Sequence, residues 1–170
     1  MATIVDLNAM LENIQTVLEN ANTTTASPID LSSNLSSASG RVKQIYKVHP
    51  NRIRPEGNVM PFITCFVTGK SMEDQTIAKS QLNLKRKGTV SVDIVGAIWN
   101  TTFQTADTDP ADADIHYLME NVELALRGAE NLSSSVLWQM PSEVKYYDSA
   151  LDEQTNLRCG VLTLKATVYY

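Results

Sequence analysis

The residues that could carry out chemistry are few and widely spaced in this chain. Gly69-Lys70-Ser71 has the ending of a phosphate-binding loop, but Thr64 stands where the first glycine of that motif is required. The residues before Gly69 are apolar and β-branched, as in a strand, so their backbone amides could not surround a phosphate. We therefore expect no nucleotide-binding site here.

The acidic segment that begins at Asp107 has the opening of a calcium-binding loop. Its fifth position is Ala111, its sixth is Asp112 where glycine is needed, and its twelfth is Leu118 instead of the ligating glutamate. Acidic residues are also favoured in the first turn of a helix, where they oppose the helix dipole. The segment therefore predicts the start of a helix and not a calcium site.

Histidine and cysteine are too sparse to predict a metal or redox site. His116 and Glu120 lie four residues apart and could form half of a metal site, but the only other histidine is His49. Cys65 and Cys159 fall in apolar stretches, so we expect buried free thiols. No pair of carboxylates stands out for acid–base chemistry. The sequence predicts no metal, no cofactor and no enzymatic activity. An unrecognised enzyme is an alternative, and it would need a deep pocket with a carboxylate of shifted pKa.

Length and composition are typical of one globular domain spanning residues 1–170. Hydrophobic residues make up 43% of the chain and charged residues 19%. The sequence contains no apolar run near the roughly 20 residues that cross a bilayer, and the acidic N-terminal segment does not resemble a secretory signal. We therefore expect no membrane association. The net charge of −5 disfavours tight binding to nucleic acid.

The charges are unevenly distributed along the chain. No acid occurs between Leu31 and Pro55, whereas seven acids and a single base lie between Asp107 and Glu130. Surfaces of opposite sign can steer like subunits into head-to-tail contact, and two solvated faces are the alternative. The candidate interface residues are Arg41, Lys43, Lys47, Arg52, Arg54, Asp107, Asp109, Asp112 and Asp114.

Two helices are predicted from apolar residues that recur every three or four positions. The first runs from Ile4 to Glu19. The second covers 110–127, with Asp109 as its N-cap and Pro110 at its first position. Residues 20–40 are rich in Ser and Thr and predict a long loop, either a mobile excursion or an arm that orders against a neighbour.

Alternating and β-branched stretches predict the strands. Because most of these strands follow one another without a helix between them, we expect antiparallel pairing. The predicted fold class is α+β, with a mainly antiparallel sheet of about four to six strands and both helices packed on one face. We expect a bulge or bend at Gly88, a break at Pro141, and strands over residues 42–48, 60–68, 81–87, 89–99, 135–147 and 157–170.

The order of these elements resembles that of the tail terminator, or tail completion, proteins of tailed bacteriophages. An N-terminal amphipathic helix precedes the sheet, the strand TVSVDIVGAIW leads through DTDPADAD into the helix IHYLMENVELALRG, and VLWQMPSEVKYYD and RCGVLTLKATVYY follow. The most suggestive feature is the helix followed by the W-x-x-P strand, Trp138 to Pro141.

The resemblance implies a structural virion protein. Such a protein forms a ring, as a hexamer, that caps the tail tube, stops its polymerisation and joins the tail to the head-side connector or neck protein. DNA would then be only cargo passing through the lumen, and the protein would be assembled in the host cytoplasm and located at the head-proximal end of the tail. A head–tail connector or stopper, a tail tube subunit and a non-viral protein-interaction module are alternatives. The aromatic residues fall mostly within strands and are expected in core and rim packing, with a subunit interface as the alternative; they are Trp99, Trp138, Tyr146, Tyr147, Tyr169 and Tyr170.

Overall fold

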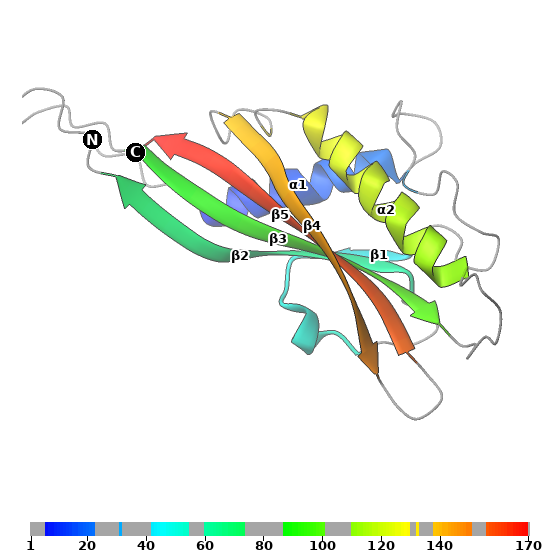
Figure 1. Cartoon of the computed structure of the whole chain (residues 1–170). Coiled ribbons are helices and arrows are strands. Elements are labelled where there is room, and N and C mark those ends of the chain that lie inside the picture. Colours follow the sequence, from blue (N-terminus) through cyan, green and yellow to red (C-terminus); the bar gives the residue numbers. More distant parts are fainter. Residues whose placement is uncertain are drawn as a thin grey trace, which may run out of the picture.

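The chain folds into one five-stranded sheet and two α-helices in a computed structural model (Figure 1). The structure describes residues 6–22, 31, 42–54, 60–73, 87–100, 110–129, 132, 138–150 and 156–169. The elements in chain order are α1 (Leu7–Ala21), β1 (Gln44–Tyr46), the 3-10 turn η1 (Pro50–Arg52), β2 (Phe62–Glu73), β3 (Lys87–Asn100), α2 (Pro110–Arg127), β4 (Trp138–Ala150) and β5 (Asn156–Tyr169).

Both helices form where the apolar spacing predicts them. Asp6 caps α1, because its carboxylate accepts hydrogen bonds from the backbone N–H groups of Asn8 and Ala9, each at 3.0 Å. The helix therefore begins at Leu7 and not at the predicted Ile4, because the capping residue Asp6 has an extended backbone, and it extends to Ala21, two residues beyond the predicted end. α2 begins at Pro110 and ends at Arg127, as predicted. The N-cap predicted at Asp109 lies outside the described residues.

The sheet has the strand order β1-β2-β3-β5-β4 and is antiparallel except for one pair. This agrees with the predicted α+β class. The exception is β1, which pairs in parallel with β2, so the expectation of antiparallel pairing between these two strands was wrong. The connection that contains η1 is long enough to return the chain to the same end of the sheet, as a parallel neighbour requires. The strand β1 is also shorter than predicted.

Two other local predictions are corrected. Gly88 lies inside β3 and pairs in register with Met72 and Val168, so the chain neither bulges nor bends there. The register shift occurs in β2 instead, between Val67 and Gly69. β4 continues through Pro141 with a shift in register after it, because an edge strand tolerates a residue without an N–H group. Of the strand predicted over 81–87, all but residue 87 lies outside the described residues.

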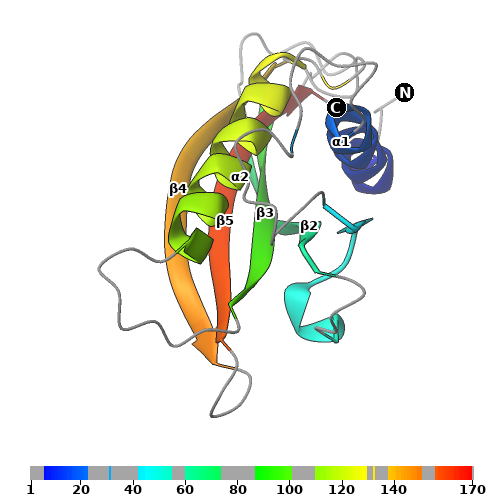
Figure 2. The same cartoon turned by 90° about the vertical axis from the view of Figure 1, so that its right-hand side faces the viewer.

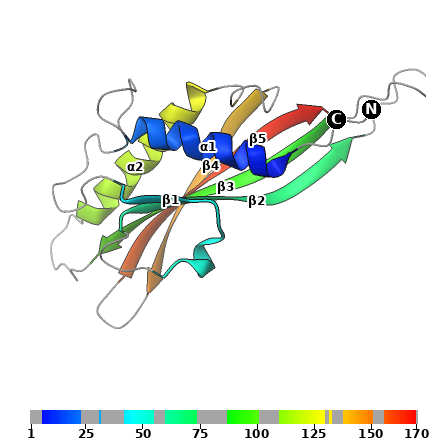
Figure 3. The ribbon, with the colours of Figure 1, turned by 180° about the vertical axis from the view of Figure 1, so that it is seen from behind.

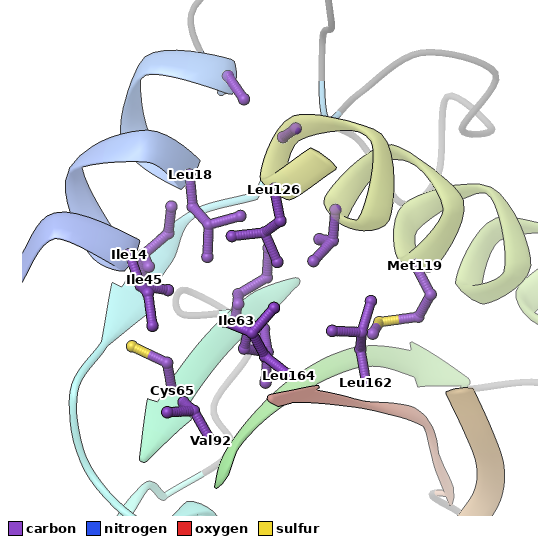
Figure 4. Close-up of a cluster of buried hydrophobic side chains, with 14 of the residues drawn as sticks. Ile14, Leu18, Ile45, Ile63, Cys65, Val92, Met119, Leu126, Leu162 and Leu164 are labelled. Carbon is purple, nitrogen blue, oxygen red and sulfur yellow. The ribbon is translucent and has the colours of Figure 1, made fainter. Parts of the chain in front are cut away.

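The two helices cover the same face of the sheet (Figures 2 and 3). α1 contacts β1 and β2, whereas α2 contacts β3, β4 and β5. Figure 4 shows side chains of both helices, among them Leu18 and Met119, pointing toward Ile63 and Leu162 of the strands. The alternating residues of β3 and β5 supply this main core, so the periodicity that predicted the strands also identified their buried face.

A second, smaller cluster lies on the sheet face away from the helices. Phe62, Ala97 and Cys159, which pair side by side across β2, β3 and β5, form its centre. Ile53, just after η1, packs against this cluster and fixes the connection between β1 and β2 on that face. The cluster therefore determines where the basic residues near η1 lie.

The segment 20–40 is described only at its start and at Leu31. Residues 20 and 21 belong to α1 and not to the predicted loop. Leu31 is fully buried in the main core, and its backbone N–H donates to the Ala21 carbonyl at 3.0 Å. Its own carbonyl accepts a hydrogen bond from Asn121 of α2 at 3.4 Å. Leu31 is thus anchored within this chain, while residues 23–30 and 32–40 of the predicted loop or arm lie outside the described residues.

Candidate functional site

The structure places the predicted interface residues in several different environments. Arg41, Asp107 and Asp109 lie outside the described residues, and Asp112 lies in the first turn of α2. Asp114, one turn further along, is only 3% exposed, so it was wrongly predicted as a surface residue. It is oriented inward by its position among the apolar residues that pack α2 onto the sheet.

The basic residues of the described segment 42–54 are exposed, as a charged surface requires. We call residues 43–54 the basic segment. Lys47 already has a partner within the chain, since its Nζ lies 3.2 Å from Glu12 of α1. Lys43, Arg52 and Arg54 form no ion pair with any described residue. Their positive charge is therefore available to a partner.

Local packing holds the basic segment in place. Ile53 packs against the second cluster, so Arg52 and Arg54 on either side of it are directed to solvent. The Nδ1 atom of His49 accepts a hydrogen bond from the backbone N–H of Asn51 at 3.2 Å. The imidazole of His49 also contacts the ring of Phe66, with ring centres 4.7 Å apart. These contacts present the two arginines on an ordered turn.

A second surface lies on α2 and β4, at the opposite edge of the sheet from β1 (Figure 2). Seven large hydrophobic residues are exposed in the described part of the chain, and five of them belong to these two elements. Three of them, Tyr117, Leu124 and Tyr146, lie on the helix side and together with Glu120 define the α2–β4 surface. Met140 and Tyr147 pair with Lys165 and Cys159, so they lie on the open face of the sheet, away from the helices.

This α2–β4 surface was largely missed by sequence reasoning. Tyr117 and Leu124 are seven residues apart and fall off the apolar stripe of α2, so they are 41% and 51% exposed. Their spacing is the signal that could have identified them, because residues seven apart lie on the same side of a helix. Tyr146 on this surface and Tyr147 on the open face of the sheet are also partly exposed, which fits the alternative of an interface role.

Charge and aromatic contacts shape the middle of the α2–β4 surface. The ring of Tyr146 packs edge-on against His116, with ring centres 4.4 Å apart. Burial raises the pKa of the Tyr146 hydroxyl, and the nearby carboxylates of Glu120 and Glu123 raise it further. Glu123 is neutralised by Arg127, whose Nη2 lies 2.6 Å away, whereas Glu120 forms no ion pair with any described residue. Among the described residues, Glu120 is thus the acid on this surface that has no ion-pair partner.

A small hollow of about 190 Å³ lies between α2 and β4. It is lined by the ion pair of Glu123 and Arg127 and by residues 141–144 around the register shift in β4. Its volume is below the 300–1,000 Å³ typical of small-molecule sites. The hollow is therefore a small depression in the α2–β4 surface, with little room for a substrate.

The remaining candidates for chemistry have structural positions. Gly69-Lys70-Ser71 lies in β2 and pairs with β3, so its backbone follows a strand and not a phosphate loop. Cys65 and Cys159 are buried free thiols, as predicted. Burial raises the pKa of Cys65 to about 12 and that of Cys159 to about 11, and a hydrogen bond with Tyr147 partly offsets the latter. Within the described residues, no group of His, Cys, Asp or Glu could hold a metal ion.

None of the helices formed by the described residues is long and apolar enough to cross a membrane. Neither a protein-family model nor a curated protein matches this chain. The proposed function therefore rests on the basic segment and the α2–β4 surface.

Proposed function

We propose that this protein is a structural subunit of a phage tail, a tail terminator that assembles into a ring, caps the tail tube and joins it to the head-side connector. The observation that supports this proposal is the presence of two different exposed surfaces at opposite edges of one sheet. The α2–β4 surface is apolar and aromatic with an available acid, whereas the basic segment carries arginine and lysine.

Two unlike surfaces on opposite sides of a subunit favour head-to-tail association. Contacts of this kind generate a closed ring when the rotation between subunits closes, and a filament when it does not. Exposed tyrosines next to charged residues are the composition expected of such an interface. A hexameric ring is the stoichiometry that the phage resemblance implies.

The order of elements adds support for a tail terminator among ring-forming proteins. An N-terminal helix, a long strand followed by an acidic helix, and two final strands are the features on which the resemblance to tail terminators rests. A lumen that lets DNA pass should bind it weakly, which agrees with the net charge of −5. In this proposal the partners are the tail tube protein and the connector, and DNA is cargo.

The first test is the mass of the purified protein by light scattering over a dilution series. We expect one discrete oligomer, six times the 18.8 kDa chain mass for a hexamer. Addition of this oligomer to growing tail tubes should then arrest their elongation at sub-stoichiometric amounts. The control is the same tube protein with an equal mass of an unrelated acidic protein.

The alternatives give different results in the same experiment. Unlimited growth into hollow rods would identify a tail tube subunit. A ring that binds a connector without arresting tube growth would identify a connector or stopper. A monomer that neither assembles alone nor binds tubes would contradict the proposal and favour a protein-interaction module.

A further inference from the structure

We infer that the ring contact joins Tyr117, Glu120 and Leu124 on α2 of one copy to Val48, Arg52 and Arg54 in the basic segment of the next copy. This inference rests on the proposed function, because it names the contact by which the copies associate. The partner that binds the outer side of α2 is thus a second copy of this chain.

The α2 side of the contact is a stripe along one side of the helix. Tyr117, Glu120 and Leu124 are separated by three and four residues, so their side chains project in the same direction. All three are exposed, and the carboxylate of Glu120 has no ion-pair partner among the described residues. The stripe therefore presents an acid between two large apolar groups.

The basic segment offers the matching groups. Val48 is an exposed apolar residue, and Arg52 and Arg54 lie close to it in the chain without an ion-pair partner among the residues that the structure describes. The Val48 carbonyl accepts a hydrogen bond from the Thr64 hydroxyl of β2, which attaches this residue to the sheet. Within η1 the backbone N–H of Arg52 donates to the His49 carbonyl at 2.9 Å. An ordered segment loses less conformational entropy on binding.

The two surfaces cannot meet within one chain. The basic segment follows β1, at one edge of the sheet, whereas α2 contacts β3, β4 and β5 toward the other edge. After one contact forms, the pair of copies therefore keeps one free surface of each kind. This is the condition under which a heterologous contact repeats until a ring closes.

Strand addition at the β4 edge is a weaker explanation for association on this side. Pro141 lacks a backbone donor, and the register shift after it interrupts the regular edge. Charged residues of β4 are already paired, Glu143 with Lys145 at 3.1 Å and Asp148 with Arg158 at 3.0 Å. Side chains of α2 are therefore the more accessible means of contact.

The test uses two charge-reversal variants of the full chain. R52E/R54E makes the basic segment negative, and E120R makes the α2 stripe positive. Each variant alone should lose the discrete oligomer and need at least about tenfold higher concentration to assemble, since like charges then face each other. The altered side chains are exposed, so the thermal unfolding transition of each monomer should match that of the wild type.

Mixing the two variants in equal amounts should restore assembly. In an alternating ring, the positive α2 of E120R faces the negative segment of R52E/R54E, and the native α2 of R52E/R54E faces the native segment of E120R. Alternation also requires an even number of subunits. The matched controls are K165E on the open sheet face and M72D in β2, both exposed and outside the contact, and both should assemble as the wild type does.

The outcomes separate this inference from the proposed function. If the wild type forms rings and caps tubes while both reversal variants assemble normally, the contact is wrong and the function stands. If the variants fail to assemble but the mixture is not restored, the two surfaces do not face each other and the contact is again overturned. If the wild type stays monomeric with or without tail tubes, the proposed function fails first and the contact fails with it.

Discussion

Replacing Gly160 by alanine should destabilise the protein, because α2 packs directly on a pair of glycines. Gly96 of β3 and Gly160 of β5 are cross-strand partners, and Met119 lies over both of them. The Met119 side chain is fully buried in the core that Figure 4 shows. The absence of two Cβ atoms at these positions is what lets the helix approach the sheet this closely.

The size of the effect follows from the contacts that a new Cβ would make. At Gly160 it would overlap Cγ of Met119 and lie 3.1 Å from its Sδ and 3.3 Å from Cε1 of Tyr146. Overpacking of a core costs about 1–3 kcal/mol. Alanine regains about 0.5–1 kcal/mol because glycine loses more backbone entropy on folding. Because the overlap is with Cγ and not with the flexible end of Met119, the cost lies in the upper part of that range, and we expect Gly160→Ala to lower the free energy of unfolding by about 1–2.5 kcal/mol.

At Gly96 the expected loss is smaller. Its nearest neighbours would be Sδ of Met119 at 2.9 Å and Cδ2 of Leu118 at 3.2 Å, which are ends of flexible side chains. Gly69→Ala is the matched control, because nothing lies within 4 Å of the Cβ that it would add. The control should leave stability unchanged or raise it slightly.

Urea unfolding at 25 °C, monitored by circular dichroism, measures these differences in the free energy of unfolding. In a separate thermal unfolding experiment, a loss of 1 kcal/mol should lower Tm by about 2–4 °C. Met119→Ala should itself cost about 2–5 kcal/mol. The double variant Gly160→Ala/Met119→Ala should lose at least about 1 kcal/mol less stability than the sum of the two single variants. The reason is that the shortened side chain at position 119 no longer overlaps the new Cβ at position 160. Additive costs, or a Gly160→Ala variant as stable as the wild type, would refute the account of helix–sheet packing.

Three further predictions test other parts of the fold. Asp6→Ala should lower the free energy of unfolding by about 1 kcal/mol in the same urea assay, because it removes the N-cap of α1, whereas Asp6→Asn should retain most of it. Gln139→Ala should cost about 1–3 kcal/mol, since the buried amide donates to the carbonyls of Leu126 and Ala129 at the end of α2, and an unchanged midpoint would contradict this role. Cys65 and Cys159 should resist iodoacetamide at pH 8 until the chain unfolds, as mass spectrometry would show. Folding raises the pKa of Cys65 from 9.0 to about 12 and that of Cys159 from 9.0 to about 11. The stability that the two protonated thiols contribute is therefore complete below pH 9 and declines as the pH rises from 9 through 11 and 12. A rise in stability from pH 9 to 11 would contradict their burial.

The sequence by itself determined the elements with strong local periodicity. Apolar residues every three or four positions predicted α1 and α2, because a helix buries one stripe of its surface. Strict alternation predicted β3 and its buried face, because successive side chains of a strand point to opposite sides. Isolated cysteines in apolar stretches were enough to predict buried free thiols. The α+β class followed from the order of these elements.

Only the tertiary structure decided which distant residues meet. The parallel pairing of β1 with β2 depends on the path of the connection between them, which no local pattern encodes. Leu31, in a polar stretch that predicted a loop, is buried because Ala21 and Asn121 hold its backbone from two separate helices. Asp114 proved to be buried although it belongs to an acidic run.

The same distinction holds for the candidate site. Charge asymmetry along the chain predicted two surfaces of opposite sign, but not that Lys47 is paired with Glu12 or that Glu120 is left available on α2. These outcomes depend on contacts between elements that are remote in sequence. Local propensity acts within a few residues of the chain, whereas burial and charge pairing depend on the whole packed molecule.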